Sequence, residues 1–321
     1  MKKKLPLDQE IYLPEYLSST AARSFEKESD QRILYWNFSK ALDEKIKMQI
    51  ELLLNEIVKS IKDREERRNR YLLPLKCLFC YAEKNKLKDI MKMEKAQEQE
   101  YSLMLKREYG NPCSSPKKFI LFCRKLLFLE SKNINWEANV WFTEGLNISS
   151  ERYSRSNAVE SFSFLDIHSH ENRQGLQRYL KYLLTVTSLN LGTIRIHHTY
   201  IKEFLSFLED CGKVITDIDR NSMEEYLKSL SMRRITAQSY NNKLQVISTF
   251  LQYLQVTDYI GEFSNPIPLY YKKSYPGVNE IDNLDQKLDL LIAHLGEFPE
   301  NLRIMSLILL TTGIKKGNYF F

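Results

Sequence analysis

The chain has 321 residues, with 47 lysines and arginines against 41 aspartates and glutamates, a formal net charge of +6 and a pI near 8.8. This mildly basic balance permits an anionic partner without requiring one, because acidic residues are interspersed with the basic ones. Apolar residues make up 43% of the chain and aromatic residues 12%, which excludes a disordered protein. With only 10 glycines and 9 prolines, the composition predicts a helical protein of two or more units.

The first 165 residues predict a helical region. Apolar positions between residues 31 and 61 recur every three or four residues, which is typical of an amphipathic helix. Further helices are expected at 72–82, 92–108 and 117–129, with Gly110-Asn-Pro112 as a helix stop. The stretch 134–165 is less regular, and its aromatic residues predict short extended pieces.

Four amphipathic helices with short loops are expected between about 171 and 266. Thr193, Asp219 (or Asn221) and Thr236 are suitable N-caps for the last three of them. We therefore predict an all-α fold whose second domain is a compact four-helix bundle of about 100 residues. Two more helices are expected, one over 284–295 and one starting near Pro299.

A resemblance to a known family lies in this second part. The order Tyr200-Ile-Lys-Glu-Phe204, Ile215-Thr-Asp-Ile218 and Leu244-Gln-Val-Ile-Ser-Thr-Phe250 resembles the SAM-like core-binding domain of tyrosine recombinases of the phage-integrase type. The segment Leu302–Gly313 is similar to the helix that opens the first catalytic motif of that family. The resemblance implies an N-terminal helical region at 1–165, a core-binding domain at 171–268, a linker at 269–275 and the incomplete start of a catalytic domain at 276–321.

The sequence departs from the family at the catalytic motif. Lys315 stands where the catalytic arginine is expected, and Asn318 stands where the glutamate is expected. A lysine cannot make the planar, bidentate contact that arginine makes with phosphate oxygens. Tyr319 has no base or arginine pair near it in sequence, and the later motifs of the family, including His-x-x-Arg and the nucleophilic tyrosine, have no counterpart. We therefore expect no catalytic residues and no DNA cleavage, and interpret the chain as truncated, whether genuinely or by a frameshift.

The partner that the resemblance implies is double-stranded DNA, with other recombinase subunits as further partners. Arginine reads guanine edges, asparagine and glutamine read adenine edges, and lysine follows the phosphates. The residues predicted to contact DNA lie on the second and fourth helices and in the linker: Arg195, His198, Lys202, Arg233, Arg234, Gln238, Asn241, Asn242, Lys243, Lys272 and Lys273. The alternative is a helical protein–protein interaction module with no role in nucleic-acid binding.

Other candidate sites favour structural interpretations. Cys77-Leu-Phe-Cys80 has a metal-like spacing, but its apolar neighbours favour core packing, and the histidines at 168, 170, 197 and 198 lack a carboxylate cluster. The run Lys62–Arg70 has mixed charge and favours a solvated helix face, with a second DNA contact as the alternative. We expect no metal, cofactor, small-molecule substrate or membrane span. The odd number of cysteines and the lack of a secretory signal predict a cytoplasmic protein.

Overall fold

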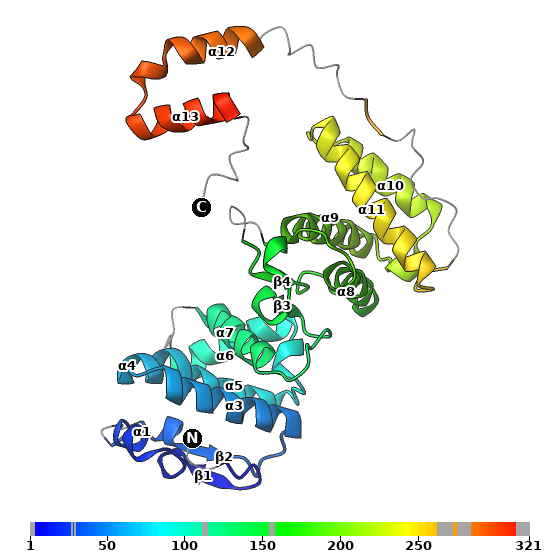
Figure 1. Cartoon of the computed structure of the whole chain (residues 1–321). Helices are drawn as coiled ribbons and strands as arrows, with labels where there is room; N and C mark the ends of the chain where they lie inside the picture. The colour runs from blue at the N-terminus through cyan, green and yellow to red at the C-terminus, as the bar shows by residue number, and fades with distance from the viewer. Residues whose placement is uncertain are drawn as a thin grey trace. The chain divides into compact units, whose positions relative to one another are not determined.

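The computed structural model describes residues 4–26, 28, 30–110, 115–153, 158–261, 272–274 and 284–312. By its internal contacts the chain divides into two compact units, residues 1–149 with 159–186, and residues 150–158 with 187–321. The described residues are mostly helical, with two small two-stranded sheets (Figure 1), so the predicted helical fold class is confirmed.

The first unit packs its helices around one apolar core. Its helices are α1 (Ser19–Arg23), α2 (Gln31–Leu34), α3 (Glu44–Ser60), α4 (Arg64–Glu66), α5 (Leu73–Lys84), α6 (Lys95–Tyr109), α7 (Pro116–Leu129) and α8 (His170–Thr185). Helix α7 contacts both α3 and α6, and α5 contacts α3 and α6; these helices run from blue to green in Figure 1. Ile46, Leu53 and Ile120 lie in this core with 1% exposure or less. The predicted helices over 72–82, 92–108 and 117–129 are confirmed with shifted ends.

The prediction of one continuous helix over 31–61 is wrong. Strand β2 (Tyr35–Asn37) interrupts it and pairs antiparallel with β1 (Glu10–Tyr12), with Ile11 opposite Trp36. Trp36 is fully buried, and its indole N–H donates to the Ile33 carbonyl at 2.9 Å. Helix α3 starts afresh after Asp43, whose carboxylate accepts from the Lys45 N–H at 2.9 Å. A partner strand distant in sequence thus overrides the helical periodicity.

The irregular stretch after α7 contains the second sheet. Strand β3 (Val140–Phe142) pairs antiparallel with β4 (Ser161–Ser163), with Trp141 opposite Phe162. Both of these aromatic side chains are fully buried. The predicted short extended pieces between 134 and 165 are therefore confirmed.

Helix α8 belongs by its contacts to the first unit. The Arg173 guanidinium donates to the Glu94 carboxylate at 2.5 and 2.8 Å and to Asn139 Oδ1 at 3.2 Å. These bonds fasten the first turns of α8 to the segment before α6 and to the segment before β3. The contact-based boundary consequently lies after residue 186, whereas the sequence places the start of the second domain at 171.

The second unit contains α9 (Leu191–Asp210), α10 (Arg220–Ser231) and α11 (Ala237–Val256). Asp219 and Thr236 cap α10 and α11 as predicted, by accepting from Ser222 N–H and Ser239 N–H. The predicted cap Thr193 is wrong, because Asn190 caps α9 by accepting from Gly192 N–H at 2.8 Å, and the helix begins before Thr193. Helix α9 packs against both α10 and α11, and the Phe204 and Tyr226 rings meet edge to face at 4.9 Å.

The cap of α11 allows a direct stability test. Thr236→Ala removes the oxygen that accepts from Ser239 N–H at 3.1 Å, and we expect the free energy of unfolding to fall by about 1 kcal/mol. Urea denaturation followed by circular dichroism measures the change. Thr249→Ala is the control on the same helix, because the Thr249 hydroxyl only donates back to the Gln245 carbonyl and its loss should be nearly neutral. Equal losses in the two variants would refute the role of the cap.

Two further helices, α12 (Leu284–Ala293) and α13 (Glu300–Thr312), follow, as the sequence predicts. Apolar side chains on α13 are exposed to an unusual degree, including Leu302 at 47% and Ile304 at 48%. Lys315, Asn318 and Tyr319 lie outside the described residues.

Candidate nucleic-acid interface

Most of the predicted DNA-contacting residues lie on helices α9 and α11. The apolar side chains Ile201 and Leu208 on α9 and Leu244 and Leu251 on α11 are fully buried. Because α9 and α11 contact each other through these faces, their polar side chains are left on the outer faces. The candidate site therefore consists of the outer faces of two packed helices and of the loop before α11.

On α9 the three predicted contacts differ in exposure. Arg195 is exposed and Lys202 is half-buried, whereas His198 is buried at 7% exposure. His198 lies one turn from Ile194 and Ile201, so it falls on the edge of the apolar face. Burial lowers the pKa of the neighbouring His197, which keeps that imidazole neutral near pH 7. Of the three residues predicted on this helix, Arg195 is the most exposed to solvent.

One carboxylate on α9 joins two of the predicted DNA contacts. Glu203 forms ion pairs with Arg233, in the loop before α11, and with Lys243 on α11. Lys243 is buried at 8% exposure, and its ammonium lies 4.7 Å from the centre of the Tyr200 ring. Burial lowers the pKa of Lys243, and the Arg233 guanidinium lowers it further. Two of the cations that the sequence assigns to DNA are thus held by an acidic neighbour.

Asn241 fixes the segment 272–274 against α11. Its side-chain amide donates to the Lys273 carbonyl at 2.8 Å, and its Oδ1 accepts from the Lys273 N–H at 2.9 Å. The Lys273 ammonium lies 4.5 Å from the Tyr240 ring centre, and Lys272 donates to Gln245 Oε1 at 3.4 Å. Asn241 is 8% exposed, so in this structure it holds the backbone of the segment instead of facing solvent.

Exposed amides follow the outer face of α11. Gln238, Asn242 and Gln245 are exposed and are spaced four and three residues apart, so they lie on one stripe of the helix. Gln245 is absent from the sequence-based set, although its seven-residue spacing from Gln238 is the signal that identifies it. Arg234 is exposed just before the helix.

The eleven predicted residues therefore fall into three groups. Those exposed to solvent are Arg195, Arg233, Arg234, Gln238, Asn242 and Lys272. Those half-buried are Lys202 and Lys273, and those buried are His198, Asn241 and Lys243. The buried residues would reach a duplex only after a local rearrangement.

The charged run Lys62–Arg70 is held by ion pairs in the first unit. Arg67 is buried and donates to Ser24 Oγ at 2.9 Å, and its guanidinium lies 4.4 Å from the Phe25 ring centre. Arg70 pairs with Glu66 at 3.2 Å. These contacts favour a structural role for Arg67, and Arg68 is half-buried beside Glu28, whereas residues 62–65 and Arg70 are exposed, as on a solvated face.

The described residues give little support to a metal site, a reactive cysteine or a membrane span. No group of three or more potential metal ligands occurs among the residues that the structure describes. Cys77 is fully buried in α5, as expected for core packing, and burial raises the pKa of the half-buried Cys80. No helix within the described part of the chain combines the length and apolarity needed to cross a bilayer.

Comparisons with known proteins agree with the geometry of α9 to α11. The family model described as "Phage integrase, N-terminal SAM-like domain" matches residues 176–256. This segment begins within α8 and ends with the last residue of α11. A protein from Pseudothermotoga lettingae named "Tyrosine recombinase" is 32% identical over 94 residues, which cover 29% of this chain and 32% of the relative.

The matched segment thus spans about a third of the length of this relative. No solved structure matches the chain. The family model falls on the segment whose helices and caps carry the resemblance seen in the sequence. Residues 176–256 thus match the N-terminal SAM-like domain of the phage integrases, and the chain is similar to a tyrosine recombinase over 94 residues.

Proposed function

We propose that this chain binds double-stranded DNA through the outer faces of α9 and α11, as the DNA-binding part of a protein that acts in site-specific recombination and DNA integration. The observation that carries the proposal is the exposed amide stripe of Gln238, Asn242 and Gln245, with Arg234 at one end and Lys272 beside it. The SAM-like domain and the relative named as a tyrosine recombinase support it.

The stripe has the chemistry that a major groove requires. The groove admits an α-helix, and asparagine and glutamine amides pair with adenine edges there. Arg234 precedes the first turn of α11, where free backbone N–H groups also attract phosphate. Arg195 on α9 and Lys272 would contact the phosphates on either side and set the register of the helix.

We further propose that the core-binding domain extends over 171–268, with the linker at 269–275, the start of a catalytic domain at 276–321 and a separate helical region at 1–165. The proposed DNA binding occurs without strand cleavage, because Lys315 stands where the family has its catalytic arginine. A point charge cannot make the bidentate contact that stabilises the transferring phosphoryl group.

The test is duplex binding measured over a series of salt concentrations. Arg234→Ala should weaken binding up to about eightfold at 0.1 M salt and reduce the slope of log affinity against log salt by about 0.9, since one phosphate contact is lost. Arg220→Ala on α10 is the matched control, because Arg220 is exposed and pairs with Glu224 at 2.8 Å on that helix. It should leave both quantities unchanged.

An absence of duplex binding at low salt would overturn the proposal. A complex with a protein that is insensitive to salt and to Arg234→Ala would favour the alternative, a protein–protein interaction module. Incubation of a bound, labelled duplex with the chain should give no covalent protein–DNA product. Detection of such a product would contradict the proposed lack of cleavage.

A further inference from the structure

The described residues 272–274, which we call the strap, are bound to α11 by a single asparagine. The Asn241 amide donates to the Lys273 carbonyl at 2.8 Å, and its Oδ1 accepts from the Lys273 N–H at 2.9 Å. Both polar atoms of one side chain therefore bind both backbone groups of one residue. Asn241 is 8% exposed in this arrangement, so its amide is closed to any other partner while the strap is in place.

Two further contacts hold the strap along the first half of α11. The Lys273 ammonium lies 4.5 Å from the centre of the Tyr240 ring, and this ring is fixed because Tyr240 is only 4% exposed. The Lys272 ammonium donates to Gln245 Oε1 at 3.4 Å. The strap is thus held by neighbouring side chains of one helix, and each of these contacts is a polar or cationic one that water or another ligand can replace.

The strap covers one border of the exposed amide stripe. Asn241 comes three residues after Gln238 and four residues before Gln245, so it lies beside both on the helix surface. Gln245 is itself a member of the stripe and accepts from Lys272. A duplex that meets the stripe would therefore reach the strap at the same border, next to the amide that the strap covers.

The backbone of Lys273 has the hydrogen-bonding pattern of an adenine edge. In the major groove adenine presents one donor, the N6 amino group, and one acceptor, N7, and asparagine pairs with both at once. The Lys273 N–H and carbonyl offer Asn241 the same combination. An exchange of the strap for adenine would leave both polar atoms of Asn241 paired, so no unsatisfied amide remains in the bound state.

We propose that the strap occupies the base-reading amide of Asn241 in the free protein and that a duplex with adenine at this position displaces it. The inference rests on the proposed duplex binding and adds a residue that determines specificity, masked until DNA is bound. A duplex without adenine offers Asn241 no such pair and gains nothing from opening the strap. The apparent affinity for DNA is lowered by the fraction of molecules in which the strap is closed.

Hydrogen exchange of the Lys273 amide, followed by NMR of the full chain, tests the displacement. This N–H should exchange slowly in the free protein and faster when an alternating dA·dT duplex is bound, because its acceptor has moved to a base. A dG·dC duplex of the same length should leave the exchange slow. An unprotected Lys273 amide in the free protein, or one that stays protected with the dA·dT duplex bound, overturns this inference alone. A chain that binds neither duplex overturns the proposed function as well.

Two substitutions of Lys273 isolate the hydrogen bond. Lys273→Pro removes the N–H that donates to Asn241, whereas Lys273→Ala, the matched control, loses the same charge and keeps the N–H. Lys273→Pro should bind the dA·dT duplex up to about fivefold more tightly than Lys273→Ala, the equivalent of one net hydrogen bond. Added to Asn241→Ala, the two substitutions should give equal affinities, with helical content unchanged by circular dichroism. Equal affinities with Asn241 in place would contradict the masking of this amide.

Discussion

Replacing Arg124 by alanine is expected to lower the free energy of unfolding by about 3–5 kcal/mol, because it leaves a buried carboxylate without its partner. Arg124 on α7 is 2% exposed, forms an ion pair with Glu98 on α6 and donates to the Ile90 carbonyl at 3.4 Å and to the Met93 carbonyl. Burial lowers the pKa of this guanidinium, and the Glu98 carboxylate opposes that effect. One side chain thus connects two helices and the turn between α5 and α6.

Urea denaturation followed by fluorescence of the buried tryptophans measures this loss. Lys125→Ala is the control on the next residue of α7, where an exposed lysine pairs with Glu144 at 2.7 Å. A surface pair of this kind contributes at most about 1 kcal/mol. The double variant Arg124→Met with Glu98→Leu should recover much of the stability, since it removes both buried charges together. If Arg124→Ala lowered the free energy of unfolding no more than Lys125→Ala does, the buried ion pair would not stabilise the first unit.

Replacing Glu203 by glutamine is expected to strengthen duplex binding roughly tenfold at 0.1 M salt. Glu203 pairs with exposed Arg233 and with buried Lys243, so loss of its charge releases the Arg233 guanidinium for a phosphate contact. The slope of log affinity against log salt should become steeper by about 0.9, the value for one new phosphate contact. Glutamine keeps the size of the side chain and an oxygen that still accepts from Lys243.

The matched control for this change is Glu224→Gln on α10. Its pair with Arg220 has the same charge, but the two side chains are 48% and 81% exposed, and neither belongs to the proposed interface. Binding and its salt slope should be unaltered there. Weaker duplex binding by a folded Glu203→Gln protein would mean that Glu203 supports the interface, and the restraining role of this carboxylate would have to be abandoned.

The helices of the second unit could be predicted from the sequence because their signals are local. Asp219 and Thr236 cap α10 and α11 where their side chains stand before an apolar repeat. The signal is less exact at α9, where Asn190 and Thr193 are both suitable caps and Asn190 is the one used. Strand β2 escaped prediction because its partner β1 is about 25 residues away, and residues 31–61 contain no local sign of that pairing.

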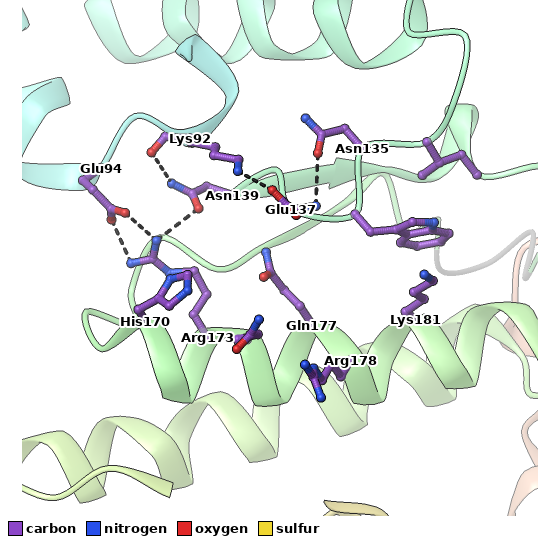
Figure 2. Close-up of a pocket in the computed structure, with 13 residues that line it drawn as sticks. Lys92, Glu94, Asn135, Glu137, Asn139, His170, Arg173, Gln177, Arg178 and Lys181 are labelled. Atoms are coloured by element: carbon purple, nitrogen blue, oxygen red, sulfur yellow. Dashed lines mark hydrogen bonds and ion pairs between the residues drawn. The ribbon is translucent and has the colours of Figure 1, made fainter. Parts of the chain in front are cut away.

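The candidate interface was predictable only in part. Sequence spacing places Asn241 and Lys243 near the polar side of α11, but their burial depends on groups elsewhere in the chain. Asn241 is covered by the backbone of Lys273, and Lys243 is covered by Tyr200 and Glu203 on α9. A pocket in the first unit is lined by residues 92–94, 134–139 and a face of α8 (Figure 2). Because these segments are far apart in the sequence, no local sequence pattern predicts the pocket. The sequence shows only the polar face of α8, on which Gln177 and Lys181 stand four residues apart.

The pair of hydrogen bonds between Asn241 and Lys273 also determines which end of α11 the segment 272–274 accompanies. Helix α11 ends at Val256, and Asn241 lies 15 residues earlier, or about 22 Å back along the helix axis. The backbone has therefore returned most of that length by Lys273. Residues 272–274 consequently lie beside the arginine-bearing end of α11, so a label attached at Lys272 would report on the entrance to this helix and not on its end at Val256.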